Sequence, residues 1–238
     1  MKSIYAAMAI SLLAPAMPAL ADEPASPLSF NASVTTDYRY RGISQTRLKP
    51  ALQGGADYAS ASGFYLGAWA STIKWIKDAG GDSNVELDIY GGYKTEISAG
   101  LTLDVGALQY VYSGNKLSPS ANTTELYAAL TYGPVTAKYS HSTSNLFGFA
   151  DSKGSGYLDL SATFELGEGF TLTPHVGHQK VRHQGSASYT DYSLTVNKDY
   201  AGFSFGLAAV GTDNDSYIGA GNKNLGKNGL LLSVKKTF

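Results

Sequence analysis

The sequence predicts an all-β protein, a transmembrane up-and-down antiparallel β-barrel of about 12 strands preceded by a cleaved signal peptide. Three observations lead to this prediction. Hydrophobic residues recur with a period of two rather than 3.6. Short and long polar connections alternate along the chain. No window after residue 21 is apolar for long enough to form a membrane helix.

Residues 1–21 have the pattern of a secretory signal peptide. Lys2 precedes an apolar run over residues 4–13, and a stretch of small residues ends at Ala21. The apolar run is too short to span a bilayer, so a membrane anchor is the weaker interpretation. The predicted domains are therefore a signal peptide at 1–21, cleaved after Ala21, and an outer-membrane barrel at 22–238.

Composition excludes two classes of protein. The chain of 238 residues contains no cysteine, so disulfides do not hold it together. Its net charge of −1 argues against a nucleic-acid partner, which would need a basic patch. One domain is expected for a mature chain of this length.

Most of the predicted strands show a regular apolar phase. Two segments, near 49–60 and 64–75, are less regular, and the phase of Tyr65, Trp69 and Ile73 is ambiguous. The regular phases, in chain order, are Phe30, Ala32, Val34; Val85, Leu87, Ile89, Tyr93; Leu101, Leu103, Val105, Ala107; Leu126, Ala128, Leu130, Tyr132; Val135, Ala137, Tyr139; Leu158, Leu160, Ala162, Phe164, Leu166; Phe170, Leu172, Val176; Tyr192, Leu194, Val196; Phe203, Phe205, Leu207, Ala209; and Leu230, Leu232, Val234, Phe238.

The connections predict antiparallel hairpins, with short turns at one end of the sheet and long loops at the other. We expect both termini on the periplasmic side and the long loops outside. Short turns are expected at 62–63, 98–100, 133–134, 167–169 and 200–202, and longer loops at 76–83, 113–121, 145–154, 182–188 and 212–227.

The stretch that continues the first strand is SVTTDYRYRGISQT. In it Asp37, Arg39 and Arg41 alternate with Tyr38 and Tyr40. Side chains of a strand alternate between two faces, and an arginine in lipid near the midplane costs about 2–4 kcal/mol. We therefore expect the two tyrosines to face lipid or the interface belt and the three charged residues to face an aqueous interior.

Charged residues occupy the phase opposite the apolar one in most strands. A soluble β-sandwich would also expose a polar phase, but it does not explain apolar phases that are rich in Tyr and Phe at the strand ends. In a barrel, side chains of opposed charge across a narrow lumen select ions and polar solutes. The predicted pore-lining residues are Asp37, Arg39, Arg41, Asp57, Glu86, Asp88, Lys94, Asp104, Glu125, Lys138, Asp159 and Glu165.

The end of the chain supports the same class. The final strand, GLLLSVKKTF, places its apolar residues on one phase and ends at Phe238. Outer-membrane barrels commonly end in such a strand. We expect it to be recognised by the barrel-assembly machinery.

Four stretches together resemble the TorF family of porins: VTTDYRYRGISQT, ADYASASGFYLGAWAS, YGGYKTEISAGLTLDVG and the terminal strand. The resemblance covers essentially the whole mature chain. It implies an outer-membrane barrel of the porin class. It brings no established substrate and no functional residues, so the solute stays open.

Two loop motifs fail as binding sites. The stretch GNKNLGKN resembles a phosphate-binding loop, but Asn228 replaces the required Ser or Thr and no helix follows. The acidic triplet that begins at Asp213 resembles a calcium loop, but Ile218 and Asn224 occupy the positions that need glycine and glutamate. Weak divalent binding by this external loop is left open.

The histidines do not indicate catalysis or a metal centre. His175 and His178 differ in parity and point to opposite faces of one strand. His141 and Ser142 are neighbours and also point apart, and no third partner is placed by spacing. We therefore expect no enzymatic activity, no metal and no cofactor.

The predicted function is passive diffusion of small hydrophilic solutes or ions through the lumen. Arg39 and Arg41 are the residues expected to attract anionic groups. The alternative is a non-conducting barrel that presents its loops to a partner. Such a barrel would have bulky inward residues, for which Leu108, Tyr110, Tyr127 and Leu231 are candidates. The apolar loop 146–149 fits a partner surface, an inward constriction or part of an aromatic belt.

Overall fold

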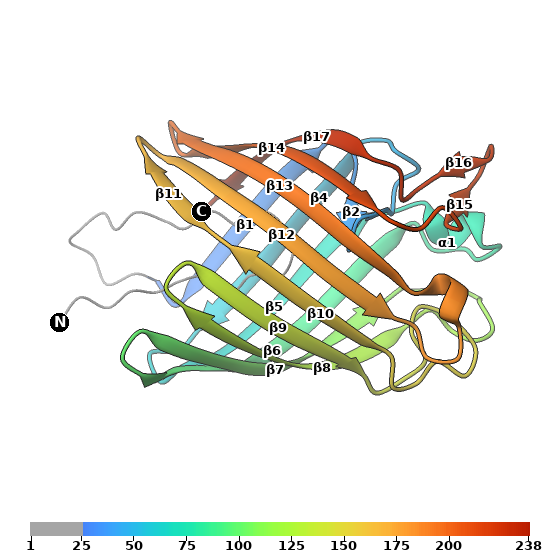
Figure 1. The fold of residues 1–238 in the computed structure, drawn as a ribbon, viewed down its shortest axis with the longest axis horizontal. Coiled ribbons are helices and arrows are strands. Elements are labelled where there is room, and N and C mark those ends of the chain that lie inside the picture. The colour runs from blue at the N-terminus through green and yellow to red at the C-terminus, as the bar shows by residue number, and fades with distance from the viewer. Residues whose placement is uncertain (1–25) are drawn as a thin grey trace.

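The computed structural model describes residues 26–238, which form a closed antiparallel β-barrel (Figure 1). The predicted signal peptide, 1–21, lies outside the described residues. Each strand pairs with the next along the chain, and pairing of β1 with β17 closes the ring. The twelve strand positions are β1 (Leu28–Thr35), β4 (Ala51–Ala59), β5 (Phe64–Thr72), β6 (Val85–Ser98), β7 (Leu101–Val111), β8 (Thr123–Tyr132), β9 (Val135–Ser142), β10 with β11 (Gly156–Ala162, Phe164–Gly167), β12 (Phe170–Lys180), β13 (Tyr189–Tyr200), β14 (Phe203–Thr212) and β17 (Gly229–Thr237). The predicted barrel is confirmed.

The two ends of the barrel differ as the connections predict. Five short turns lie at one end, which we call the turn end and which also carries the C-terminus (Figure 1, left). The other end, the loop end, carries six longer connections. Its small elements are β2 (Arg39–Tyr40), β3 (Ile43–Ser44), α1 (Trp75–Asp78), η1 (Gly185–Ala187), β15 (Ile218–Gly219) and β16 (Lys223–Asn224). No helix within residues 26–238 is long and apolar enough to cross a membrane.

The predicted apolar phases form the outer surface of the barrel. Leu230 is 74 % exposed and Leu52 is 63 % exposed, whereas their strand neighbours are more buried. A belt of exposed leucine, valine and phenylalanine is unfavourable in water and is matched by lipid. The ambiguous pair, Tyr65 and Trp69, faces inward. Closure leaves no unpaired strand edge in this belt, as a bilayer requires.

The prediction for the first strand is wrong beyond Thr35. There β1 ends, and residues 36–50, here called the plug hairpin, turn into the barrel before β4 begins. Tyr38 is 2 % exposed and Tyr40 is half-buried, so neither faces lipid. A short hairpin and a longer strand have the same alternation over five residues, so periodicity did not distinguish them.

A tight turn directs the plug hairpin across the lumen. Arg41 and Gly42 both have positive φ, 45° and 78°, and join the paired residues Tyr40 and Ile43. Two such residues are characteristic of a type I′ turn. A Cβ on Gly42 would lie 2.6 Å from the Thr212 methyl group. The tip of the hairpin therefore packs directly against the barrel wall at β14.

Inward tyrosines lie over glycines of the adjacent strand. Gly106 of β7 pairs in register with Tyr127 of β8. A Cβ on Gly106 would lie 2.5 Å from the Tyr127 hydroxyl and 2.5 Å from the carbonyl oxygen of Gly91. The absence of a side chain on Gly106 lets the tyrosine ring lie along the wall instead of across the lumen.

We predict that Gly106→Ala destabilises the barrel by about 1–3 kcal/mol, the usual effect of overpacking. The matched control is Gly54→Ala on the outer face, where the nearest atom to a new Cβ is at 3.2 Å. Denaturant unfolding in detergent, followed by tryptophan fluorescence, measures the difference. Equal stability of the two variants would contradict the close contact of Tyr127 with the wall.

Candidate functional site: a lumen closed by the plug hairpin

Each predicted pore-lining residue either points into the barrel from a strand or lies on the plug hairpin. Seven are buried: Asp37, Arg41, Glu86, Asp88, Asp104, Glu125 and Asp159. Four are partly buried: Arg39, Asp57, Lys94 and Lys138. Glu165 of β11 is exposed at the turn end, beside its partner Thr171. The prediction that this set lines a conducting pore stays a prediction.

The tyrosines of the plug hairpin bind the barrel wall at β5–β7. The Tyr38 hydroxyl donates a hydrogen bond of 2.6 Å to Glu86, and its ring contacts Trp69 edge-on at 5.4 Å. The hydroxyl oxygens of Tyr40 and Tyr110 are 2.6 Å apart. Buried aromatic pairs of this geometry contribute beyond their buried area. The hairpin is thus packed into the wall rather than loosely placed in the lumen.

The apolar loop 146–149 folds inward and covers the hairpin. Leu146 is buried, and the Phe147 ring packs edge-on against Tyr40 at 5.4 Å and Tyr110 at 5.1 Å. Among the interpretations of this loop, the structure supports the inward constriction over a surface that binds a partner. Leu146 and Phe147 are not available at a loop tip to bind a partner.

Arg41 at the tip of the hairpin contacts the opposite wall of the barrel. Its guanidinium donates to both carboxylate oxygens of Glu125 at 3.0 and 2.7 Å, and to Gln179 at 2.6 Å. It also lies 4.1 Å from the centre of the Tyr157 ring. Two-pronged pairing of this kind is strong and directional. Arg41 therefore fixes the hairpin to β8, β10 and β12 at once.

Arg39 and Asp37 stabilise the hairpin from within. The Arg39 Nε donates to Asp37 at 2.5 Å, and Ser44 and Thr46 donate to the other Asp37 oxygen. Arg39 also donates to the carbonyl oxygen of Leu225 at 2.9 Å, which links the hairpin to the loop before β17. Both arginines are thus engaged by carboxylates, and neither guanidinium is presented to a passing anion in this conformation.

One partly buried and one exposed ion pair connect the surrounding loops. Arg47 donates to Asp78 at 2.7 Å and Lys116 to Asp82 at 2.8 Å. The hydrogen bond from Lys116 lowers the pKa of the Asp82 carboxyl and raises that of Lys116 itself. Solvent screens such pairs, and their contribution to stability is small. Closure of the loop end therefore depends on the buried contacts of the hairpin.

Solvent access to the lumen differs between its two ends. Near the loops, inward side chains such as Ser71, Thr123 and Ser142 are almost completely buried. The space left beside Arg41 is a cavity of about 20 Å³, which has room for one water. Near the turns, many inward residues are partly exposed, among them Asn31, Ser33, Asp57, Lys94, Thr136, Lys138, Ser161, Thr173, Ser204, Ser233 and Lys235, whereas Thr171 and Asn197 are buried. The lumen is a chamber that is closed at the loop end and partly accessible to solvent from the turn end.

The chamber has two unlike walls. On β4–β9, tyrosines are bonded to charged residues: Tyr90 donates to Asp57, Tyr65 to Asp104 at 2.6 Å, and the Lys138 ammonium lies 4.1 Å from the Tyr127 ring. On β13, β14 and β17 most inward residues are small and polar or apolar, including Ser193, Thr195, Ser204, Ala208 and Ser233, and the inward charged residues are Asp191, Asp199 and Lys235. More of the charged side chains therefore lie on the β4–β9 side of the chamber.

The histidine side chains point to the faces that strand alternation predicts. His175 faces inward, with Nε2 3.0 Å from Asp159 and Nδ1 3.7 Å from Asp191, whereas His178 is exposed on the outer face. His141 points outward and Ser142 inward. Within residues 26–238 no group of three or more His, Cys, Asp or Glu side chains is arranged to hold a metal ion.

Four lumen residues were missed in the sequence. They are Asp191, Asp199, Gln179 and Lys235, which all face inward. Asp191, Asp199 and Lys235 alternate with the outward apolar residues of β13 and β17, so extending the alternation rule to every polar residue of these strands would find them. Gln179 carries no charge, and only its contact with Arg41 marks it.

The barrel resembles solved porin structures. The KdgM porin matches with a TM-score of 0.58 and 9 % sequence identity, over 88 % of this chain and 98 % of that one. The NanC porin matches with a TM-score of 0.57 and 12 % identity, over 88 % and 98 % of the two chains. Identities this low show a shared fold alone.

Comparison of sequences places the chain in a family. No curated protein sequence matches it significantly. Residues 21–238, essentially the whole barrel, match the profile of a family described as bacterial protein of unknown function, Gcw_chp. The chain belongs to the Gcw_chp family, and within it takes the form of a twelve-stranded barrel with the fold of the KdgM and NanC porins.

Proposed function

We propose that this protein is an outer-membrane channel for small hydrophilic solutes or ions, closed at its external mouth by the plug hairpin. The observation that carries the proposal is the polar, solvent-accessible chamber inside a closed twelve-stranded barrel. The fold shared with the KdgM and NanC porins and the resemblance to the TorF family support it. The termini lie on the periplasmic side and the loop end faces outward.

Passage is passive and depends on displacement of the hairpin. The chamber is accessible from the turn end, and residues 36–50 and the loop 146–149 close the other end together with buried residues of neighbouring loops, among them Ile76 and Leu225. No step in diffusion needs a cofactor or an energy source. The outer-membrane lipid and the barrel-assembly machinery, recognised through the strand that ends at Phe238, are the partners of the same proposal.

A filled, non-conducting barrel is the competing function. The buried Arg41–Glu125 pair and the cavity of about 20 Å³ beside it favour a permanently closed lumen. The two functions differ in whether the hairpin leaves its site. Conductance measurements on the folded barrel therefore decide between them.

We predict that replacing residues 36–50 with an Asn-Gly turn opens the channel. The flanking residues Thr35 and Ala51 are paired across β1 and β4, so a two-residue turn can join them. In planar bilayers the wild-type barrel should show brief or small openings and the variant long, larger ones. If neither folded protein conducts, the channel proposal is wrong.

We predict that Arg41→Asn increases the time that the channel spends open. Asn accepts the positive φ of this position, so the variant removes the ion pair without adding backbone strain. Breaking a buried pair and leaving Glu125 alone costs about 3–5 kcal/mol. Open probability in single-channel records measures the effect. The matched control is Arg47→Ala in the same segment, which removes a pair at the outer rim whose arginine is in contact with solvent and should leave gating unchanged.

We predict that the opened lumen prefers cations. Acidic residues outnumber basic ones on the inward strands: Asp57, Glu86, Asp88, Asp104, Glu125, Asp159, Asp191 and Asp199 against Lys94, Lys138 and Lys235. In a salt gradient, the reversal potential of the hairpin-deletion channel should have the sign of cation selectivity. Asp57→Asn with Asp104→Asn should weaken this selectivity, and the loop variant Asp213→Asn should not. Anion selectivity of the deletion channel would contradict the charge assignment.

A further inference from the structure

The outer surface of the barrel carries one basic hollow, at the loop end between β9, β10 and β12. His141 of β9 and Lys180 of β12 are exposed there, and each pairs in register with Gly156 of β10. The three residues form a single rung across three adjacent strands. Gly156 has no side chain, and the Tyr139 ring lies over it between the imidazole and the ammonium group, since a Cβ on Gly156 would overlap the Tyr139 hydroxyl.

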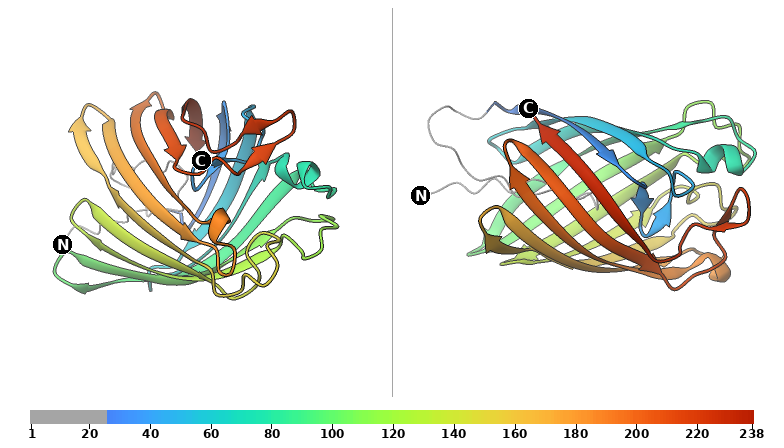
Figure 2. Two further views of the ribbon diagram at one scale, coloured as in Figure 1. Left: turned by 45° about the vertical axis from the view of Figure 1, so that its right-hand side comes forward. Right: turned by 90° about the horizontal axis from the view of Figure 1, so that it is seen from above.

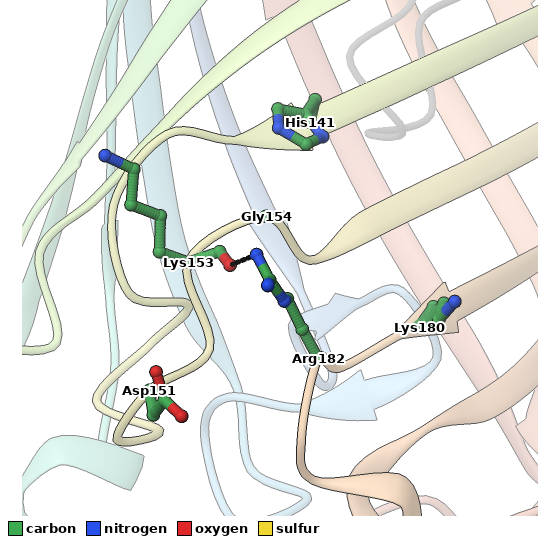
Figure 3. A pocket seen from close by; sticks show the side chains of 6 residues that line it. All are labelled: His141, Asp151, Lys153, Gly154, Lys180 and Arg182. Carbon is green, nitrogen blue, oxygen red and sulfur yellow. Dashed lines mark hydrogen bonds between the residues drawn. The ribbon is translucent and has the colours of Figure 1, made fainter.

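Arg182 and Lys153 line the same hollow from the loops. Arg182 donates from Nη1 to the carbonyl oxygen of Lys153 at 3.2 Å, as Figure 3 shows. A Cβ on Gly154 would lie 3.0 Å from the same Arg182 nitrogen and 3.9 Å from Cε1 of His141. The guanidinium and the imidazole thus converge over a residue whose small size keeps the space free.

The hollow is basic and wide enough for a headgroup. Its volume is about 560 Å³, and its lining contains three permanently positive side chains, those of Lys153, Lys180 and Arg182. The one acidic residue in the lining, Asp151, is 2.9 Å from His183. On the twelve barrel strands of residues 26–238, Lys180 is the only lysine or arginine that faces outward at the loop end. Other exposed lysines at this end lie in the loops and their small elements, among them Lys74, Lys77, Lys116 and Lys223.

The hollow lies at the boundary of the apolar belt. One rung below His141 and Lys180, the outward residues are Tyr139, Leu158 and His178; below them they are Ala137, Leu160 and Val176. The leucines and the valine are exposed, as lipid-facing residues of the belt are. A tyrosine next to a basic rung above apolar rungs is the arrangement expected where lipid headgroups meet acyl chains.

We propose that this hollow binds the phosphate group of an anionic lipid in the outer leaflet, with the acyl chains lying along Tyr139, Leu158 and Leu160. Arg182 and Lys180 supply charge-assisted hydrogen bonds to the phosphate oxygens, and Lys153 adds a third positive charge. The inference rests on the location and orientation given under Proposed function. It does not depend on conductance, so a barrel that fails to conduct can still bind lipid.

The test measures lipid binding to the folded barrel in detergent. Lipid A, a phosphorylated glucosamine lipid, is titrated onto the delipidated protein, and bound lipid is counted by native mass spectrometry. The triple variant Lys153→Gln, Lys180→Gln and Arg182→Gln should bind about a hundredfold more weakly, since each basic residue near an anionic lipid surface contributes about fivefold. The single variant Lys180→Gln should lose about fivefold, and it stands in if the triple variant does not fold.

Matched controls separate this site from the general charge of the loops. Lys116→Gln, Lys223→Gln and Lys227→Gln together remove three positive charges from other loops and should leave lipid A binding unchanged. Lipid A without its phosphates should bind weakly, and inorganic phosphate should not displace intact lipid A. Equal binding by wild type and the triple variant, equal loss in the control triple variant, or equal binding of dephosphorylated lipid A would each overturn the proposal. Displacement by inorganic phosphate alone would assign the hollow to a free anion instead of a lipid.

Discussion

The whole structure depends on one constraint, the pairing of every backbone N–H and C=O group in the apolar belt. Hydrocarbon offers no hydrogen-bond partner, so a sheet in a bilayer must close on itself. Here the last strand, β17, completes the ring by pairing with β1. Closure fixes the parity of all twelve strands, so it also decides which side chains meet lipid and which enter the lumen. The chamber and the basic hollow are both consequences of that parity.

Closure creates a second problem, because a ring of twelve strands is wider than its inward side chains alone can fill at the loop end. The protein fills the space with its own chain. The plug hairpin brings Tyr38 and Arg41 to carboxylates on the wall and Tyr40 to the Tyr110 hydroxyl, so each of these polar groups has a partner. Buried charges are tolerated only when they are paired in this way. The hairpin is joined to the wall by these polar contacts and by aromatic packing, such as that of Tyr38 on Trp69, rather than by a strand ladder.

The barrel separates its charges by compartment. Inside, carboxylates predominate along the β4–β9 wall, whereas the outer face at the loop end gathers Lys180, Arg182 and Lys153 in one hollow. This separation depends on strand register. A shift of one residue would turn every side chain of a strand to the opposite face and would place the lumen charges in lipid. The function of the lumen and the lipid contact of the outer face are thus carried by alternate residues of the same strands.

The sequence by itself determined the strand phases, the short turns, the long loops and the inward side of Asp57, Glu86, Asp104 and Glu125, because alternation with a period of two is a local property. Only the tertiary structure decided where Tyr38, Tyr40 and Arg41 go. Their alternation suits a strand, but a type I′ turn at Arg41-Gly42 and partners up to 138 residues away hold them inside the lumen. Such long-range contacts are absent from any local pattern. For the same reason the convergence of His141, Lys153 and Arg182 became visible only when three strands lay side by side.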